Sequence, residues 1–286
     1  MSVSTAELDR ARAGALGLIR SELLKIRTTN AWWWFALGML GWTLIALAFN
    51  MWFAYFAFND PGMLGPEAGG FTSPEYHASN IYTSGQFLGL MFVMLIGILM
   101  VTNEFFHQTA TATFLTTPRR TVVIMSKLVT AVLIGMAFAV VITAIDLAAG
   151  AVFFHTQDLG TMLGEWPVQR AILLNLVAFG VWTIFGVAIG TLITNQLAAT
   201  ITAAVLYLVG TQLAQVAFFV LSAWLDSEAV LHWQVIVPST ASQVMTLGGE
   251  GIPGSPEWWV GALVLLGYAV VAGVVGTLIT RKRDIS

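Results

Sequence analysis

The composition of this 286-residue chain excludes a soluble globular protein. Hydrophobic residues make up 57% of the sequence and charged residues only 9%, and the mean hydropathy is +0.82. Soluble domains carry about 25% charged residues, so the sequence predicts an integral membrane protein. The net charge of -3 and the absence of cysteine give no basis for a nucleic-acid partner, a disulfide framework or a thiolate metal site.

The first thirty residues predict a lead-in that lies outside the bilayer. Residues 1 to about 15 are polar and small, as in a solvated tail. Over residues 16–27, apolar side chains recur at steps of three and four, which is typical of an amphipathic helix at a membrane surface; a frayed segment with chance periodicity is the alternative. The chain then enters the bilayer, and tryptophan is favoured at the membrane–water interface that it crosses there. The expected interfacial anchor comprises Trp32, Trp33, Trp34, Arg20, Lys25 and Arg27.

Six apolar runs follow, each long enough to cross a bilayer, which takes about 20 residues. They predict an all-α membrane protein with spans at about 31–58, 85–101, 128–154, 171–194, 197–221 and 258–280. A polar loop at 59–84 precedes the second span, and a longer connection, 102–127, follows it. The fourth and fifth spans are joined only by Asn195 and Gln196, as in a tight hairpin. Residues 1–30 and 31–286 are therefore expected to be a surface segment and a transmembrane domain.

The basic residues predict the orientation of the spans. With six spans, the two termini and the connections 102–127 and 195–196 share one side of the membrane. Eleven of the twelve Lys and Arg residues fall on that side, and only Arg170 falls on the other. Because Lys and Arg accumulate on the cytoplasmic side, both termini are expected in the cytoplasm of a cell whose plasma membrane holds the protein.

The sequence contains no recognised catalytic pattern. It has no G-x-x-x-x-G-K-[ST] phosphate loop, no H-E-x-x-H zinc motif and no G-x-S-x-G elbow, so we expect no catalytic residue, no metal site and no enzyme activity in this chain. Asp146 is the clearest ionisable residue inside a span. Such residues are costly to bury and often functional; a structural polar contact, the lining of a substrate path and proton coupling are the three readings.

Two segments resemble a known family. Residues 104–109 (EFFHQT), residues 115–120 (LTTPRR) and Lys127 are similar to the loop after the second span in the membrane subunits of ABC-2 type ATP-binding-cassette exporters. Residues 21–27 (SELLKIR) resemble the entry helix of the same family. The chain departs from the pattern at Gln108, where the family commonly has glycine, so the local turn is expected to differ.

The resemblance implies a permease that is driven by a separate ATPase subunit, which would bind ATP and magnesium. The 102–127 connection would form a coupling helix that docks on the ATPase through Glu104, Phe105, Phe106, His107, Thr109, Phe114, Pro118, Arg119 and Arg120. The alternative is that Phe105, Phe106 and Phe114 only hold a helix at the surface of the lipid bilayer. The other expected partners are a second permease copy, membrane lipid and an amphiphilic substrate, such as a drug, lipid or peptide, that would be exported.

Two further features are open to more than one interpretation. Residues 224–257 resemble the re-entrant element that precedes the last span in these permeases, which would gate the outer mouth. Gly186 and Gly190 form a G-x-x-x-G pair that serves either a contact between subunits or helix packing within one subunit. A secondary transporter or channel that uses an ion gradient is the alternative function, with Asp146 as its main support.

Overall fold

The computed structural model describes residues 5–60, 73–109, 120–227, 229–248 and 255–282. Within these ranges all the regular elements are helices and none is a strand. Six helical segments are long and apolar enough to cross a membrane. The predicted all-α, multi-pass membrane architecture is therefore confirmed.

The helices follow the predicted spans, with some different bounds. The long helices are α1 (Thr5–Thr28), α2 (Ala31–Asn59), α4 (Gln86–Phe106), α6 (Arg120–Thr156), α7 (Trp166–Leu192), α8 (Gln196–Val205), α9 (Thr211–Leu225) and α12 (Trp258–Lys282). The short ones are α3 (Pro74–Ile81), η3 (Leu206–Gly210), α10 (Ala229–His232), η4 (Trp233–Ile236) and α11 (Pro238–Leu247). The fifth span consists of α8, η3 and α9 in succession.

The predicted bounds are wrong in three places. The polar loop expected at 59–84 contains the buried helix α3, and the second span runs from Pro74 to Phe106. The expected solvated tail is helical from Thr5 onward, so α1 is longer than the predicted 16–27 segment. The expected connection 102–127 shrinks to residues 107–119, because α4 continues to Phe106 and α6 already begins at Arg120. The helices extend past the apolar runs because the charged residues that seemed to end the runs are paired with one another, as described below.

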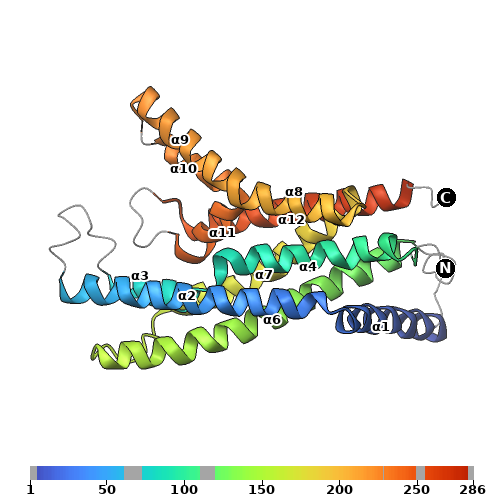
Figure 1. Ribbon diagram of the computed structural model, residues 1–286, viewed down its shortest axis with the longest axis horizontal. Helices are drawn as coiled ribbons and strands as arrows, with labels where there is room; N and C mark the ends of the chain where they lie inside the picture. The colour runs from blue at the N-terminus through green and yellow to red at the C-terminus, as the bar shows by residue number, and fades with distance from the viewer. Residues whose placement is uncertain (1–4, 61–72, 110–119, 228, 249–254, 283–286) are drawn as a thin grey trace.

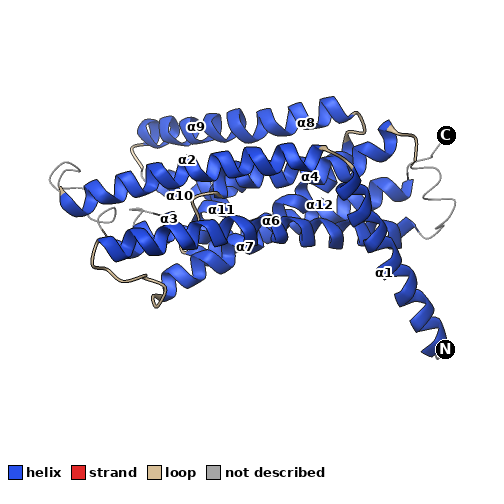
Figure 2. Cartoon of the chain, turned by 60° about the horizontal axis from the view of Figure 1, so that its bottom comes forward, coloured by secondary structure: helices blue, strands red, loops and turns tan. Residues whose placement is uncertain are grey.

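Both termini lie at one end of the bundle (Figure 1). We call this the near end; it carries α1, the end of α4, the start of α6 and the end of α12. The far end carries α3, α10 and α11. In Figure 2, α1 leaves the bundle at an angle to the long helices, as expected of a helix that does not itself cross the bilayer.

The core of the bundle is the contact between α4 and α7. Fifteen of the 21 residues of α4 are buried, and the two helices approach closely where both lack side chains. A Cβ atom at Gly186 would overlap the carbonyl oxygen of Met94, and one at Gly97 would overlap that of Thr183. The G-x-x-x-G pair therefore packs helices within one chain, since Gly190 likewise lies against Ile98 of α4.

The fifth and sixth spans have large exposed surfaces. The hairpin between α7 and α8 is tight, as predicted, and the Asn195 side chain caps α8 by accepting a hydrogen bond from the Ala198 N–H at 3.0 Å. The π-helical segment η3 interrupts the fifth span, and α9 then diverges from the other helices (Figure 1). Only 11% of the residues in the apolar windows of the fifth and sixth spans are buried within the chain.

The segment predicted to be re-entrant contains a buried helix. In α11, Ser239, Ala241, Ser242 and Met245 are all buried, and the helix packs between α7 and α12. The indole N–H of Trp182 on α7 donates a hydrogen bond to the Ser242 hydroxyl at 2.8 Å. Helix α11 is thus an integral part of the far end.

Candidate functional site: a buried charge ring beside the 107–119 connection

Four charged side chains meet at the near end, on three helices. Glu22 and Lys25 come from α1, Glu104 comes from the end of α4, and Lys127 comes from the first turns of α6. Three of the four are nearly inaccessible, with 3%, 4% and 5% of Glu22, Glu104 and Lys127 exposed. We call these four residues the charge ring.

Each acid in the charge ring contacts both bases. Lys127 Nζ lies 2.7 Å from Glu22 Oε2 and 2.8 Å from Glu104 Oε1. Lys25 Nζ lies 2.7 Å from Glu22 Oε1 and 2.5 Å from Glu104 Oε1. Lys127 also donates to the carbonyl oxygen of Met100 at 3.3 Å. The four ion pairs therefore close a cycle that joins α1 to α4 and α6.

The charge ring is electrically neutral, and this explains how it can be buried. An isolated ion loses several kcal/mol of hydration in a low-dielectric site, and only well-oriented partners offset that loss. Burial disfavours the charged form of Lys25, but its hydrogen bonds to Glu104 and Glu22 outweigh this effect and raise its pKa above the ordinary value. The ring consequently has a structural role: it fixes α1 to the helices on both sides of the connection.

Helix α4 ends beside the ring in a Schellman motif. The Thr109 N–H donates to the Glu104 carbonyl at 2.9 Å, and the Gln108 N–H donates to the Phe105 carbonyl at 3.2 Å. In this motif the first residue after the helix cap has the left-handed backbone conformation. Gln108 occupies that position and has φ +56°. Gln108 therefore adopts the left-handed backbone conformation that glycine favours.

The residues predicted to contact the ATPase differ in exposure, and some lie outside the described residues. Phe106 is 70% exposed at the near end, and its ring meets that of the exposed His107 edge-on at 5.0 Å. Phe105 is half-buried and packs against the apolar cluster of Ile96 and Met100. Phe114, Pro118 and Arg119 lie outside the described residues, and of Arg120 only the backbone is described, at the start of α6.

The structure assigns Glu104 to a different partner from the predicted one. The family resemblance implied that Glu104 would contact the ATPase. In the structure the side chain is buried and paired with Lys25 and Lys127. A direct contact with another protein does not fit this burial, because the carboxylate would have to leave two ion pairs.

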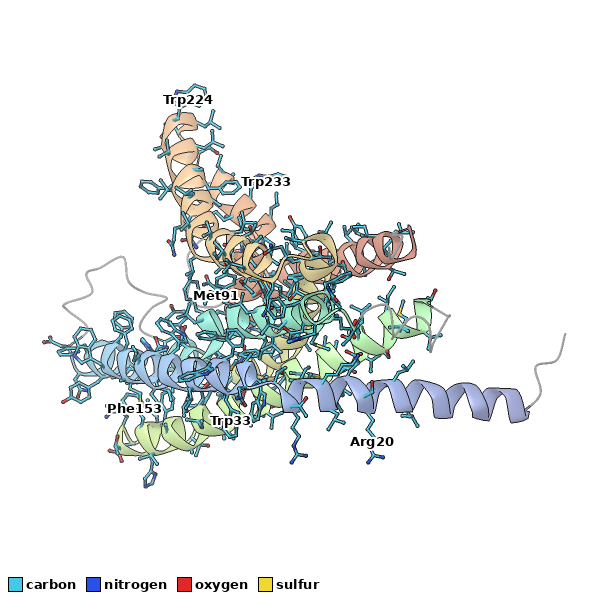
Figure 3. All side chains as sticks on the ribbon, turned by 45° about the vertical axis from the view of Figure 1, so that its right-hand side comes forward. Arg20, Trp33, Met91, Phe153, Trp224 and Trp233 are labelled. Carbon is cyan, nitrogen blue, oxygen red and sulfur yellow. The ribbon has the colours of Figure 1, made fainter. Side chains whose placement is uncertain are left out.

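The residues of the predicted interfacial anchor gather where α1 meets α2. Arg20 extends away from the bundle (Figure 3), whereas Lys25 belongs to the charge ring. The rings of Trp32 and Trp33 stack with centroids 4.2 Å apart. The Trp32 N–H donates to the carbonyl oxygen of the exposed Arg27 at 3.4 Å. Trp34 is 74% exposed, so the segment presents aromatic surface to its surroundings.

Asp146 is fully buried in the far half of α6. The backbone amide of Gly85, at the start of α4, interacts with its carboxyl, although neither carboxyl oxygen has a hydrogen bond of good geometry within the described chain. Asp146 is not among the residues that line the near-end cavity described next, and its place beside the start of α4 is compatible with a structural polar contact.

A cavity of about 830 Å³ opens at the near end, between the end of α4 and the α7–α8 hairpin. Its wall includes Phe35, Leu99, Phe106, Asn195 and Thr200. Apolar and uncharged polar groups thus alternate around a space that adjoins the exposed Phe106. Among the described residues no group of three His, Cys, Asp or Glu side chains is placed to hold a metal ion.

Two members of the ring, Glu22 and Lys127, were not predicted as site residues. Both lie in the segments that carry the family resemblance. The available signal was the i, i+3 spacing of Glu22 and Lys25 on a predicted helix, together with an acid at the end of one span and a base before the next. Opposite charges in segments that border the bilayer at the same depth are candidates for pairing.

Comparison with known proteins gives one result. A family model described as "Protein of unknown function (DUF2705)" matches residues 31–286, which include all six spans. No curated protein matches the chain.

Proposed function

The chain belongs to the DUF2705 family, and we propose that it is the permease subunit of an ABC-2 type exporter, driven by a separate ATPase. In this proposal both termini are cytoplasmic and the protein spans the plasma membrane. The partner would bind ATP and magnesium, and the substrate is an amphiphile such as a drug, lipid or peptide. The sequence resemblance at residues 104–109, 115–120 and 21–27 is the starting point.

The charge ring is the observation that carries the proposal. A force applied to the 107–119 connection is useful only if the connection is rigidly joined to the spans. The ring joins α1, α4 and α6 directly at the two ends of that connection. Phe106, exposed beside it, supplies apolar surface of the kind found at the centre of protein interfaces.

The exposed spans support a second permease subunit. The fifth and sixth spans bury little of their apolar surface within the chain. In the proposed transporter these spans contact lipid or another permease chain, and the near-end cavity beside Phe106 is the entry for the substrate. Helix α11, buried at the far end, is the element proposed to gate the outer mouth.

A secondary transporter driven by an ion gradient has weaker support. Such proteins place charged residues or broken helices along the substrate path near the bilayer centre. Asp146, the residue that suggested this function, lies against the start of α4 and outside the wall of the near-end cavity. The exporter is therefore the better-supported function.

The test is co-purification with an ATPase encoded beside this chain. Phe106→Asp would place a charge on the proposed docking surface without touching the charge ring, and we expect the ATPase to be lost from the purified complex. Trp224→Asp is the matched control, because Trp224 is an equally exposed aromatic residue at the tip of α9 (Figure 3). Equal ATPase recovery with both variants would exclude this docking surface, and a wild-type chain that binds no ATPase would refute the proposed function.

A further inference from the structure

A second cavity, at the far end, combines apolar and aromatic wall with a cluster of uncharged hydrogen-bonding side chains. Its volume is about 500 Å³, within the range of small-molecule sites. It lies between α2, α3, α4 and α11, which come together at the far end (Figure 1). The polar part of its wall includes Asn50, Tyr76, Asn80, Ser84, Gln86 and Gln243.

Among the residues that the structure describes, no charged side chain lines the cavity. Its described wall contains no Asp, Glu, Lys, Arg or His. A charged ligand would lose its hydration there without gaining a counter-ion, which is costly. Amides and hydroxyls, by contrast, can both donate and accept hydrogen bonds. The wall therefore suits an uncharged ligand with several groups, such as hydroxyls, that both donate and accept hydrogen bonds.

The remaining wall is aromatic. The rings of Trp42 and Phe87 lie with centroids 6.1 Å apart and 52° between their planes, and Phe49 lines the same space. The Trp42 indole N–H has no acceptor within the described chain. An aromatic face beside clustered amides offers packing for the C–H face of a pyranose ring and hydrogen bonds for its hydroxyls.

Two of the polar side chains have atoms left for a ligand. Gln243, on α11, makes no side-chain hydrogen bond with the described residues, and Asn50, on α2, uses its amide N–H to reach the Ser84 hydroxyl at 2.9 Å. The carbonyl oxygen of Asn50 and the whole amide of Gln243 are thus available from two different helices. A ligand held by both would bridge α2 and α11.

From this wall chemistry we propose that the far-end cavity binds an uncharged sugar ring. The inference concerns binding alone and holds whether or not an ATPase drives the protein. The ring could belong to a soluble glycoside or to the headgroup of a glycolipid. Both present the same hydroxyl groups to the cavity, so the test has an arm for each source.

The test measures binding to the full chain in lipid nanodiscs by calorimetry. Methyl β-glucoside is the probe, and glucuronate and glucosamine are matched rings with one negative or one positive charge. We expect the neutral glycoside to bind and the charged rings to bind at least tenfold more weakly. In the second arm, nanodiscs contain monoglucosyl diacylglycerol or phosphatidylglycerol, and native mass spectrometry identifies the retained lipid. Saturation by the free glycoside or selective retention of the glucolipid supports the site and identifies the source.

Three variants locate the site. Asn50→Leu and Gln243→Leu each remove hydrogen-bonding groups from the wall, and we expect each to weaken binding about fivefold, the effect of one neutral hydrogen bond. Gln212→Leu is the control, since Gln212 is exposed on α9 and outside the cavity. If Asn50→Leu fails to fold, Gln243→Leu decides the result, because it breaks no bond within the described chain. Wild-type affinity in the cavity variants, equal binding of charged and neutral rings, or no binding of either probe would overturn the proposal.

Discussion

The two ends of the bundle hold their polar groups together in different ways. At the near end, two acids and two bases form four ion pairs within 2.8 Å, and Glu22, Glu104 and Lys127 have almost no access to water. At the far end, the buried contacts between helices are mostly made by hydroxyls, amides and an indole, such as Trp182 to Ser242 and Thr211 to Ser239.

This difference bears on how easily each end can change shape. Breaking one buried ion pair leaves an uncompensated charge, at a cost of about 3–5 kcal/mol. Breaking one neutral hydrogen bond costs only about 1 kcal/mol. The near end is therefore built to move as one piece with α1, whereas the far end can exchange its partners one at a time. A proposed exporter needs both properties: a rigid attachment for its motor and an outer mouth that rearranges.

The largest effect is expected from Lys127→Met. The substitution keeps the volume of the side chain but leaves Glu22 and Glu104 with Lys25 as their only base in the ring. We expect the free energy of unfolding to fall by about 3–5 kcal/mol, because one buried negative charge becomes uncompensated. Thermal unfolding of the purified protein in detergent measures the change.

A double variant separates the charge from the packing. Lys127→Met combined with Glu104→Gln restores a neutral ring of one acid and one base. We expect most of the lost stability to return, since a buried ion pair replaced by neutral groups of similar size is often close to neutral in free energy. A single variant that unfolds at the wild-type temperature would show that the ring does not join the three helices.

The second prediction concerns Arg170, the buried base of the far end. Its guanidinium donates to the Gly248 carbonyl at 3.4 Å and lies 5.6 Å from the centroid of the Trp258 ring. We expect Arg170→Gln to lower stability by about 2 kcal/mol, the sum of a charge-assisted bond and a cation–π contact. Arg170→Lys keeps the charge but loses the planar group, so full stability in that variant would show that the charge alone is sufficient.

A smaller effect is expected at the contact between η3–α9 and α11. The hydroxyls of Thr211 and Ser239, both buried, lie 2.8 Å apart. We expect Ser239→Ala to cost about 1 kcal/mol, because the Thr211 hydroxyl loses its neutral partner. Thr211→Val with Ser239→Ala completes a double-mutant cycle. Additive losses in that cycle would mean that the two hydroxyls do not interact.

Sequence reasoning succeeded where hydrophobicity decides the structure. All six spans follow from runs of apolar residues, and the hairpin at Asn195 follows from their spacing, because the bilayer leaves a chain few other options. The same reasoning failed at the edges of the spans. The predicted connection 102–127 includes Glu104 and Lys127, but opposite charges on adjacent helices can be buried together, and the helices then extend past the apolar run.

Contacts between helices could not be predicted from one sequence, because they depend on how the whole bundle packs. Nothing in the local pattern distinguishes Gly186, which lies against the backbone of α4, from Gly267, which has open space around it. Likewise, Gln243 sits in a stretch that is polar enough for a loop, yet it lies on a packed helix and lines a cavity. Which face of a helix meets a neighbour depends on the whole bundle.

The smallest prediction is a gain in stability at Gln108, the strained point of the near end. A non-glycine residue in the left-handed region costs about 1–2 kcal/mol, while a glycine adds about 0.4–1 kcal/mol of entropy to the unfolded chain. Gln108→Gly should therefore stabilise the protein by about 0.5 kcal/mol, the net of these two effects. Gln108→Ala, which keeps the strain, is the control; an equal gain in both variants would trace the effect to the lost amide rather than to the φ of +56°.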